Sequence, residues 1–231
     1  MGIFFGILSL ICFCLLASKV LSAKLRFKKV DKLLMKVHKP ISVFLIITCF
    51  VHILSVVPIL KNRNLLVVIS GIVNIAFMVL LIYLCHRIKE RKKKILWHRI
   101  LTILMAISII GHFTIYIIDF NNYQENIKSI EINHINLKNV EDGLYKGKYN
   151  AGYIYAEVEA KIKDGIIVSI KLLEHRNERG KRAEEIINEI ISAQEIDVDT
   201  ISGATNSSKV IKKAVEKAIT NKQPEPLPLR E

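Results

Sequence analysis

Four long apolar runs dominate the first half of the chain and restrict what it can fold into. They lie at residues 3–23, 40–60, 64–85 and 95–118, and each is close to the ~20 residues that a helix needs to cross a bilayer. The first run has no basic residues before it and no small-residue cleavage site, so we expect it to be retained rather than removed as a signal peptide.

Beyond residue 120 the apolar residues become sparser, which predicts a change from membrane to water. We expect a four-helix transmembrane bundle over residues 1–120, a polar linker over 121–140 that could include an amphipathic stretch, and a small α+β domain over 141–221. Residues 222–231 are rich in proline, and we expect them to form an extended, mobile tail.

The distribution of charge indicates how the spans are oriented. Residues 1–120 carry 17 Lys and Arg against three acidic residues, whereas residues 121–231 carry 17 against 18. The net charge of +13 therefore flanks the membrane spans, which argues against a nucleic-acid partner. The basic connectors at residues 24–39 and 87–99 are expected in the cytoplasm. The N-terminus and the C-terminal domain would then lie on the outer side of the membrane.

Four histidines form two equally spaced pairs within the spans. His38 and His52 lie fourteen residues apart on the second run, and His98 and His112 lie fourteen apart on the fourth. Fourteen residues turn a helix through about 1400° and advance it about 21 Å, so each pair shares one face at two depths. The second and fourth runs point the same way, which places His38 level with His98 and His52 level with His112. Facing imidazoles at each level could hold one b-type haem by its axial positions.

A structural role is the alternative for these histidines, either at the membrane interface or in hydrogen bonds between helices. Polar side chains in hydrocarbon are costly and usually functional, which favours the two-haem arrangement. Gly71 and Gly111 would leave room for a flat macrocycle, although small residues in spans also serve helix packing. In pattern only, this half of the chain resembles cytochrome b and ferric-reductase-like membrane domains.

The C-terminal part shows the pattern of a small antiparallel sheet. Apolar and polar residues alternate strictly over residues 153–162, as in a half-buried strand. Asp164 and Gly165 follow as a hairpin turn into the apolar residues 166–170. Isoleucines at 186, 187, 190 and 191 then form the apolar stripe of a helix.

The segment Asp199–Thr205 reads D-T-I-S-G-A-T, and Asn206 and two serines follow it. Small residues before the threonine let the chain turn sharply and leave its hydroxyl accessible. Apolar residues repeat at helical spacing from residue 210 to 219, so we expect a helix capped by Asn206 or Ser207. Its amino end would favour a phosphate group. An ordinary loop and cap is the alternative.

From about Asp142 to Ile219, the chain resembles the FMN-binding domain shared by the flavin-carrying subunits of Rnf and Nqr respiratory complexes and by related bacterial surface electron-transfer proteins. The resemblance implies that a flavin transferase attaches FMN to Thr205 through a phosphoester. The matching motif comprises Asp199, Ser202, Gly203, Ala204, Thr205 and Ser207. Asp199 could hold the metal or orient the hydroxyl during the transfer.

A second stretch of this domain resembles the family's loop beside the flavin ring. It includes His175, Asn177 and Gly180, and a solvated charged loop is the alternative. The chain has no nucleotide-binding glycine pattern, so we expect the electron donor to be a membrane quinol or a separate partner. Three functions remain open: electron transfer through haem and flavin to an external acceptor, a subunit of a larger ion-pumping complex, or a non-enzymatic flavin-binding redox sensor.

Overall fold

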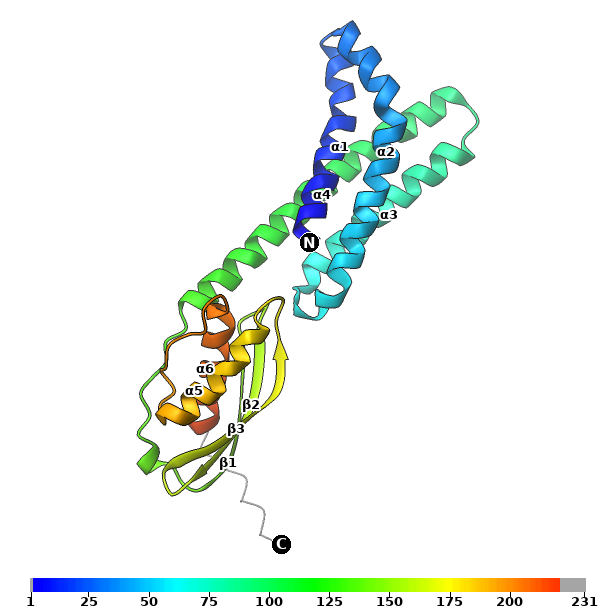
Figure 1. The fold of residues 1–231 in the computed structure, drawn as a ribbon. Helices are drawn as coiled ribbons and strands as arrows, with labels where there is room; N and C mark the ends of the chain where they lie inside the picture. Colours follow the sequence, from blue (N-terminus) through cyan, green and yellow to red (C-terminus); the bar gives the residue numbers. More distant parts are fainter. Residues whose placement is uncertain (1, 221–231) are drawn as a thin grey trace. The chain divides into compact units, whose positions relative to one another are not determined.

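The computed structural model describes residues 2–220 of the chain, with helices in the first half and a small α+β fold in the second (Figure 1). The four long helices are α1 (Gly2–Lys24), α2 (Lys28–Val56), α3 (Leu65–Arg87) and α4 (Arg91–Lys128). A 3₁₀ helix, η1 (Val57–Asn62), continues α2. The proline-rich tail expected at residues 222–231 lies outside the described residues.

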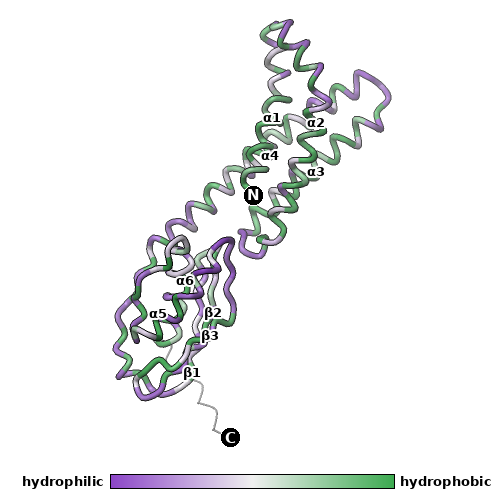
Figure 2. Tube along the Cα trace, in the orientation of Figure 1, coloured by the Kyte–Doolittle hydropathy of each residue, from purple (hydrophilic) through white to green (hydrophobic). Residues whose placement is uncertain are grey.

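All four long helices are long and apolar enough to cross a membrane, as the sequence predicts. Their middle sections are coloured as hydrophobic in Figure 2, and many large apolar side chains on them are exposed, as is usual for lipid-facing helices. Chain contacts divide the molecule into two compact units. The first consists of Met1–Lys61 and Ile72–Ile109, and the second consists of Asn62–Gly71 and Ile110–Glu231.

The first unit is held by a core to which every long helix contributes. Cys12 and Phe13 of α1, Leu45 of α2 and Met105 of α4 are buried together, and Phe77 of α3 packs against them. A buried hydrogen bond of 3.0 Å between the hydroxyls of two further residues, Ser9 and Thr48, joins α1 to α2. Small polar groups of this kind commonly bond helices to one another in membranes.

Two helices extend well beyond the apolar runs that predict them. Helix α2 begins at Lys28, twelve residues before its apolar run, because lysine is a good helix former and the basic connector becomes its first turns. Helix α4 has 38 residues and therefore measures about 57 Å, against the ~30 Å of a hydrocarbon core. Its last turns occupy the beginning of the segment in which we expected a polar linker.

The second unit contains a three-stranded antiparallel sheet in the order β1 (Gly143–Asn150), β2 (Tyr155–Lys163) and β3 (Ile166–Arg176). Strand β2 alternates buried and half-buried residues as its sequence predicts. The predicted hairpin turn is also confirmed: Asp164 and Gly165 have φ angles of 54° and 72°, the left-handed pair of a type I′ turn. The fold class is thus the expected one, four membrane-length helices followed by a small α+β domain.

Two helices pack against this sheet: α5 (Ile186–Ala193) contacts β3, and α6 (Thr205–Thr220) contacts β1 and β2. The predicted isoleucine stripe is confirmed, because Ile186 and Ile190 of α5 are fully buried. Gly147 of β1 lies directly beneath α6, and a Cβ atom there would collide with the backbone of Ala214 and Ala218. The absence of a side chain at Gly147 therefore lets α6 lie close to the sheet.

Candidate functional site

The segment Asp199–Thr205 connects α5 to α6 and brings a threonine to the surface. Gly203 has a φ of +76°, which favours glycine, and no other atom lies within 4 Å of where its Cβ would be. Ala204 is buried, whereas Ser202 and Thr205 are exposed. The Thr205 hydroxyl is therefore accessible at the first residue of α6.

The start of α6 differs from the sequence prediction. The carbonyl of Ala204 accepts the first helical bond from the Ser208 amide at 2.9 Å, so Ala204 is the N-cap and the prediction of a cap at Asn206 or Ser207 is wrong. Ser208, buried in the first turn, instead accepts a bond from the Ile201 amide at 3.1 Å. Helix α6 begins earlier than expected, and Thr205 carries its hydroxyl on the turn with the unpaired amides, where an anion is favoured.

The loop that follows β3 lies against this first turn. Gly180 faces Ser207, and a Cβ at Gly180 would collide with the serine side chain. The Gly180 amide donates to Asn177 Oδ1 at 2.9 Å, which closes the loop. The structure therefore brings together the stretch around Thr205 and the stretch from His175 to Gly180, which the sequence analysis singles out. Asp199 is exposed on the connecting segment.

His175, at the end of β3, leads into this loop and has only 3% of its side chain exposed. Its Nδ1 lies 3.0 Å from Glu184 Oε1 and 3.3 Å from Asn177 Nδ2. The carboxylate is the closer partner and can only accept, so Nδ1 donates to it. Among the described residues, Nε2 has no hydrogen-bond partner although it is buried. A buried nitrogen without a partner, in the stretch whose Gly180 faces Ser207 of α6, fits a bound group that can form a hydrogen bond with it, as FMN could.

In the first unit, the structure brings His38 of α2 and His98 of α4 together. Their ring centroids are 6.1 Å apart and the rings are inclined at 68°. An iron atom bound at about 2 Å by a nitrogen of each ring would separate the ring centres by roughly 6 Å, so the spacing fits a shared metal. Cys85 Sγ lies 3.7 Å from His98 Nδ1.

The other two histidines each have a hydrogen bond at Nδ1 and a glycine beside the ring. His52 Nδ1 lies 2.8 Å from the carbonyl of Gly2, and a Cβ at Gly6 would approach the His52 ring to 3.1 Å. His112 Nδ1 lies 2.8 Å from Ser70 Oγ, and a Cβ at Gly71 would lie 3.5 Å from its ring. Histidines that bind metal through one nitrogen are usually oriented through the other in this way.

These glycine contacts agree only in part with the sequence analysis. Gly71 lies beside an imidazole, but Gly111 has no atom within 4 Å of its Cβ position and Gly6 was not anticipated. Gly6 falls in a run that contains no histidine, so the sequence gives no signal for its role. His86 is exposed.

Comparison with known families bears on the second unit. Residues 151–220 match the family of the FMN-binding domain. The four membrane-length helices lie outside the matched residues, and neither the curated proteins nor the solved structures yielded a match. The matched region contains β2, β3, α5 and α6. The segment around Thr205 and the stretch from His175 to Gly180 therefore both lie inside the FMN-binding domain.

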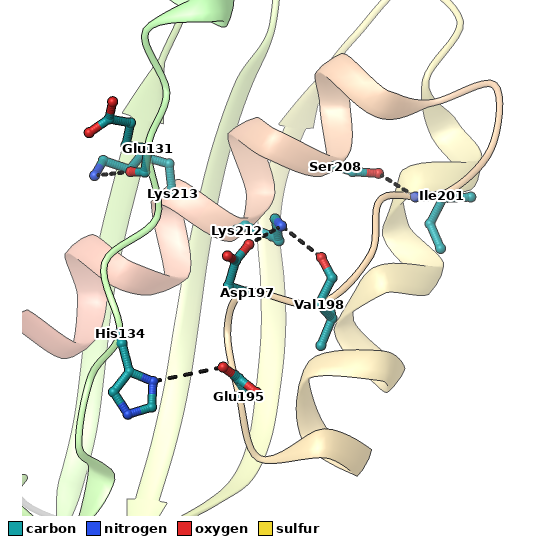
Figure 3. A network of polar contacts seen from close by, with 9 residues as sticks. All are labelled: Glu131, His134, Glu195, Asp197, Val198, Ile201, Ser208, Lys212 and Lys213. Atoms are coloured by element: carbon teal, nitrogen blue, oxygen red, sulfur yellow. Dashed lines mark hydrogen bonds and ion pairs between the residues drawn. The ribbon is translucent and has the colours of Figure 1, made fainter.

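Within the FMN-binding domain, a lysine that we did not anticipate fixes the segment leading to Thr205. Lys212 is 5% exposed, and its ammonium donates to Asp197 Oδ1 and to the Val198 carbonyl, each at 2.7 Å (Figure 3). With the bond from the Ile201 amide to Ser208, two residues of α6 hold this segment at two points. Lys212 stands among the apolar positions of α6, and that placement is the signal that could have identified it.

Replacement of Lys212 by methionine is expected to loosen this segment while the apolar stem stays packed. The loss of two charge-assisted bonds should lower the free energy of unfolding by about 1–3 kcal/mol, and FMN attachment should decrease because Thr205 is held less firmly. Thermal unfolding and in-gel flavin fluorescence of the full chain would measure both effects. Lys209→Met is the matched control one turn earlier, and equal effects from both variants would contradict a specific role for Lys212.

Proposed function

We propose that this chain carries electrons across the bacterial cytoplasmic membrane, through two b-type haems, to FMN attached covalently at Thr205, and from there to an acceptor outside. The observation that carries the proposal is the course of α4. One helix bears both His98 and His112 and then continues to Lys128, where it joins the core of the FMN-binding domain.

The protein side of each haem site would consist of one histidine from α2 and one from α4. His38 and His98 would hold the haem near the cytoplasm, and His52 and His112 the haem near the outer surface. The bonds at Nδ1 of His52 and His112 support this assignment, because they orient each ring and increase the basicity of the other nitrogen.

On the flavin side, Thr205 would supply the oxygen of the phosphoester, and a flavin transferase would form the bond. Its exposure leaves room for that enzyme. His175 Nε2 would accept a hydrogen bond from the flavin, with Glu184 holding the tautomer that makes this possible. Haem iron and FMN supply the redox chemistry, and the protein residues bind and orient them.

Purified full-length chain, expressed with a flavin transferase and sufficient haem, tests the proposal. We expect a reduced-minus-oxidised spectrum of low-spin b haem, two haems per chain, and a fluorescent band in denaturing gels. Covalent flavin without haem would instead support a flavin-binding redox sensor, and stable co-purification of further redox subunits would support a larger complex. A protein without either cofactor would refute the proposal.

The orientation of the chain gives a separate prediction. By the distribution of basic residues, the proposal has residues 87–99 inside and the FMN-binding domain outside. A membrane-impermeant maleimide should label Lys148→Cys in intact cells but should label Lys92→Cys only after permeabilisation. Both lysines are exposed, so a difference in labelling would reflect the side of the membrane on which each residue lies. The reverse labelling pattern would overturn the proposed topology.

A further inference from the structure

We propose that Tyr123, Tyr153 and Asn206 form a rigid joint that holds the flavin-bearing end of α6 against α4. Electrons would then pass from the outer haem to FMN over a fixed distance within one chain, rather than by a swinging flavin domain. The inference rests on the proposed function, and it makes the end of α4 part of the domain, where the sequence predicts a polar linker.

The outer end of α4 is part of the core of the FMN-binding domain. Tyr123 and Ile127 of α4 are 8% and 4% exposed, and Ile130, just after the helix, is 7% exposed. They belong to the same buried cluster as Val158 of β2 and Val215 of α6. A tether would leave such residues in water, whereas their burial removes large apolar surface from water and so stabilises the joint.

Tyr123 makes two specific contacts in addition to its burial. Its ring stacks on Tyr153, with centroids 4.7 Å apart and planes inclined by only 12°. Its hydroxyl accepts a hydrogen bond of 3.0 Å from Nδ2 of Asn206, the residue next to Thr205. Gly152, just before β2, has a φ of +102°, and a Cβ atom built there would lie 3.8 Å from the Tyr123 side chain. The chain therefore passes close to Tyr123 at this point. The joint thus reaches the flavin attachment point itself.

Arg63, in the segment between η1 and α3, adds a cation to the same stack. Its guanidinium carbon lies 3.7 Å from the centroid of the Tyr153 ring, and it forms an ion pair with Glu178. Burial raises the pKa of the Tyr153 phenol, an effect that Arg63 opposes, so this ring stays neutral at physiological pH. A neutral ring between an aromatic and a cation is a stable arrangement.

A row of rings on α4 connects this joint to the proposed outer haem ligand. His112, Tyr116, Phe120 and Tyr123 are spaced by four, four and three residues, so they lie on one face of the helix. The centroids of Tyr116 and Phe120, and of Phe120 and Tyr123, are each 6.1 Å apart. The row advances about 16 Å along the helix axis. The ring contacts thus begin at Tyr116, one helical turn from His112, and end at Tyr123, which contacts the residue next to Thr205.

Each electron passed along this path would come from one ferrous haem iron, which would become ferric, and would reduce the flavin by one electron. Two such transfers, with two protons from water, would reduce the flavin fully, and the external acceptor would reoxidise it. The quinol or partner protein that donates to the inner haem would restore the ferrous iron.

Tyr123→Leu and Tyr153→Leu in the full-length protein test the joint. Hydrogen exchange of residues 119–130 should be slow in the parent protein and faster in both variants. Oxidation of the prereduced haems by an impermeant ferric complex should also become slower, because the flavin would no longer be held at one distance from the outer haem. Tyr155 is a half-buried tyrosine on β2 outside the joint. Tyr155→Leu should therefore change neither the hydrogen exchange of residues 119–130 nor the rate of haem oxidation.

Tyr123→Phe is a control for misfolding, because it removes only the hydroxyl that Asn206 contacts. It should show faster exchange and slower oxidation to a smaller degree than Tyr123→Leu. Fast exchange of residues 119–130 in the parent, or unchanged oxidation rates in variants with faster exchange, would overturn the inference. Haem and flavin content, scored on the same samples, reports separately on the proposed function. A chain without haem would refute that function while the exchange data still test the joint.

Discussion

Thr205→Val is expected to abolish covalent flavin, so that no fluorescent band remains in a denaturing gel of the full-length chain. Valine has nearly the shape of threonine but lacks the oxygen that would form the phosphoester. Because Thr205 is exposed, the substitution should leave the fold intact. The haem spectrum should also persist, since the four histidines lie on other helices. Mass spectrometry of the peptide that contains residue 205 would confirm the loss.

Thr200→Val serves as the control for this experiment. Thr200 lies in the same connecting segment, five residues earlier, and is half-buried, so a general effect of valine on the segment would show there too. Retention of the flavin in Thr200→Val and its absence in Thr205→Val identifies the attachment point. Undiminished fluorescence in Thr205→Val would show that FMN is attached elsewhere and would contradict the assignment.

His112→Leu is expected to reduce the haem content from two per chain to one. Leucine is apolar and of similar size, so it can occupy the space beside Ser70 and Gly71, but it offers no nitrogen to the iron. The remaining haem should be the one between His38 and His98, whose ligands are unaffected. His52→Leu should give the same spectrum as His112→Leu, because both variants would lack the same haem. A pyridine haemochrome assay per mole of protein measures the content.

His86→Leu provides the comparison, since His86 is an exposed histidine in the last turn of α3. It should retain both haems. Equal haem content in His112→Leu and in the parent protein would contradict the proposed pairing. A loss of both haems in His112→Leu, with α-helical content unchanged by circular dichroism, would show that the two sites do not fill independently.

The membrane half illustrates how much of the fold can be predicted from sequence. The four spans follow from run length, because lipid requires long unbroken helices. The ends of α2 and α4 could not be predicted in this way, since they are amphipathic or charged segments whose helical state depends on what they pack against. Tyr123 and Ile127 look like residues of a polar linker until the domain that buries them is known.

In the FMN-binding domain, too, some elements could be predicted from the sequence and others could not. Strand β2 and its hairpin follow from alternation and turn chemistry, whereas β1 has a weak signal because its buried positions include Gly143 and Gly147. The N-cap of α6 was misplaced because Asn206 and Ser207 are good capping residues, yet tertiary contacts to Tyr123 and Gly180 place them inside the helix. Lys212 lies among the apolar positions of α6, and its two hydrogen-bond partners could be identified only from the fold.

If electrons leave the haems through the flavin on Thr205, removal of that flavin should block their exit. Stopped-flow oxidation of prereduced protein, held in lipid nanodiscs, by a soluble ferric complex measures this. We expect rapid oxidation of both haems in the parent protein, whereas the haems of Thr205→Val should remain reduced over the same time. Haem oxidation at the same rate in both proteins would contradict this role of the flavin.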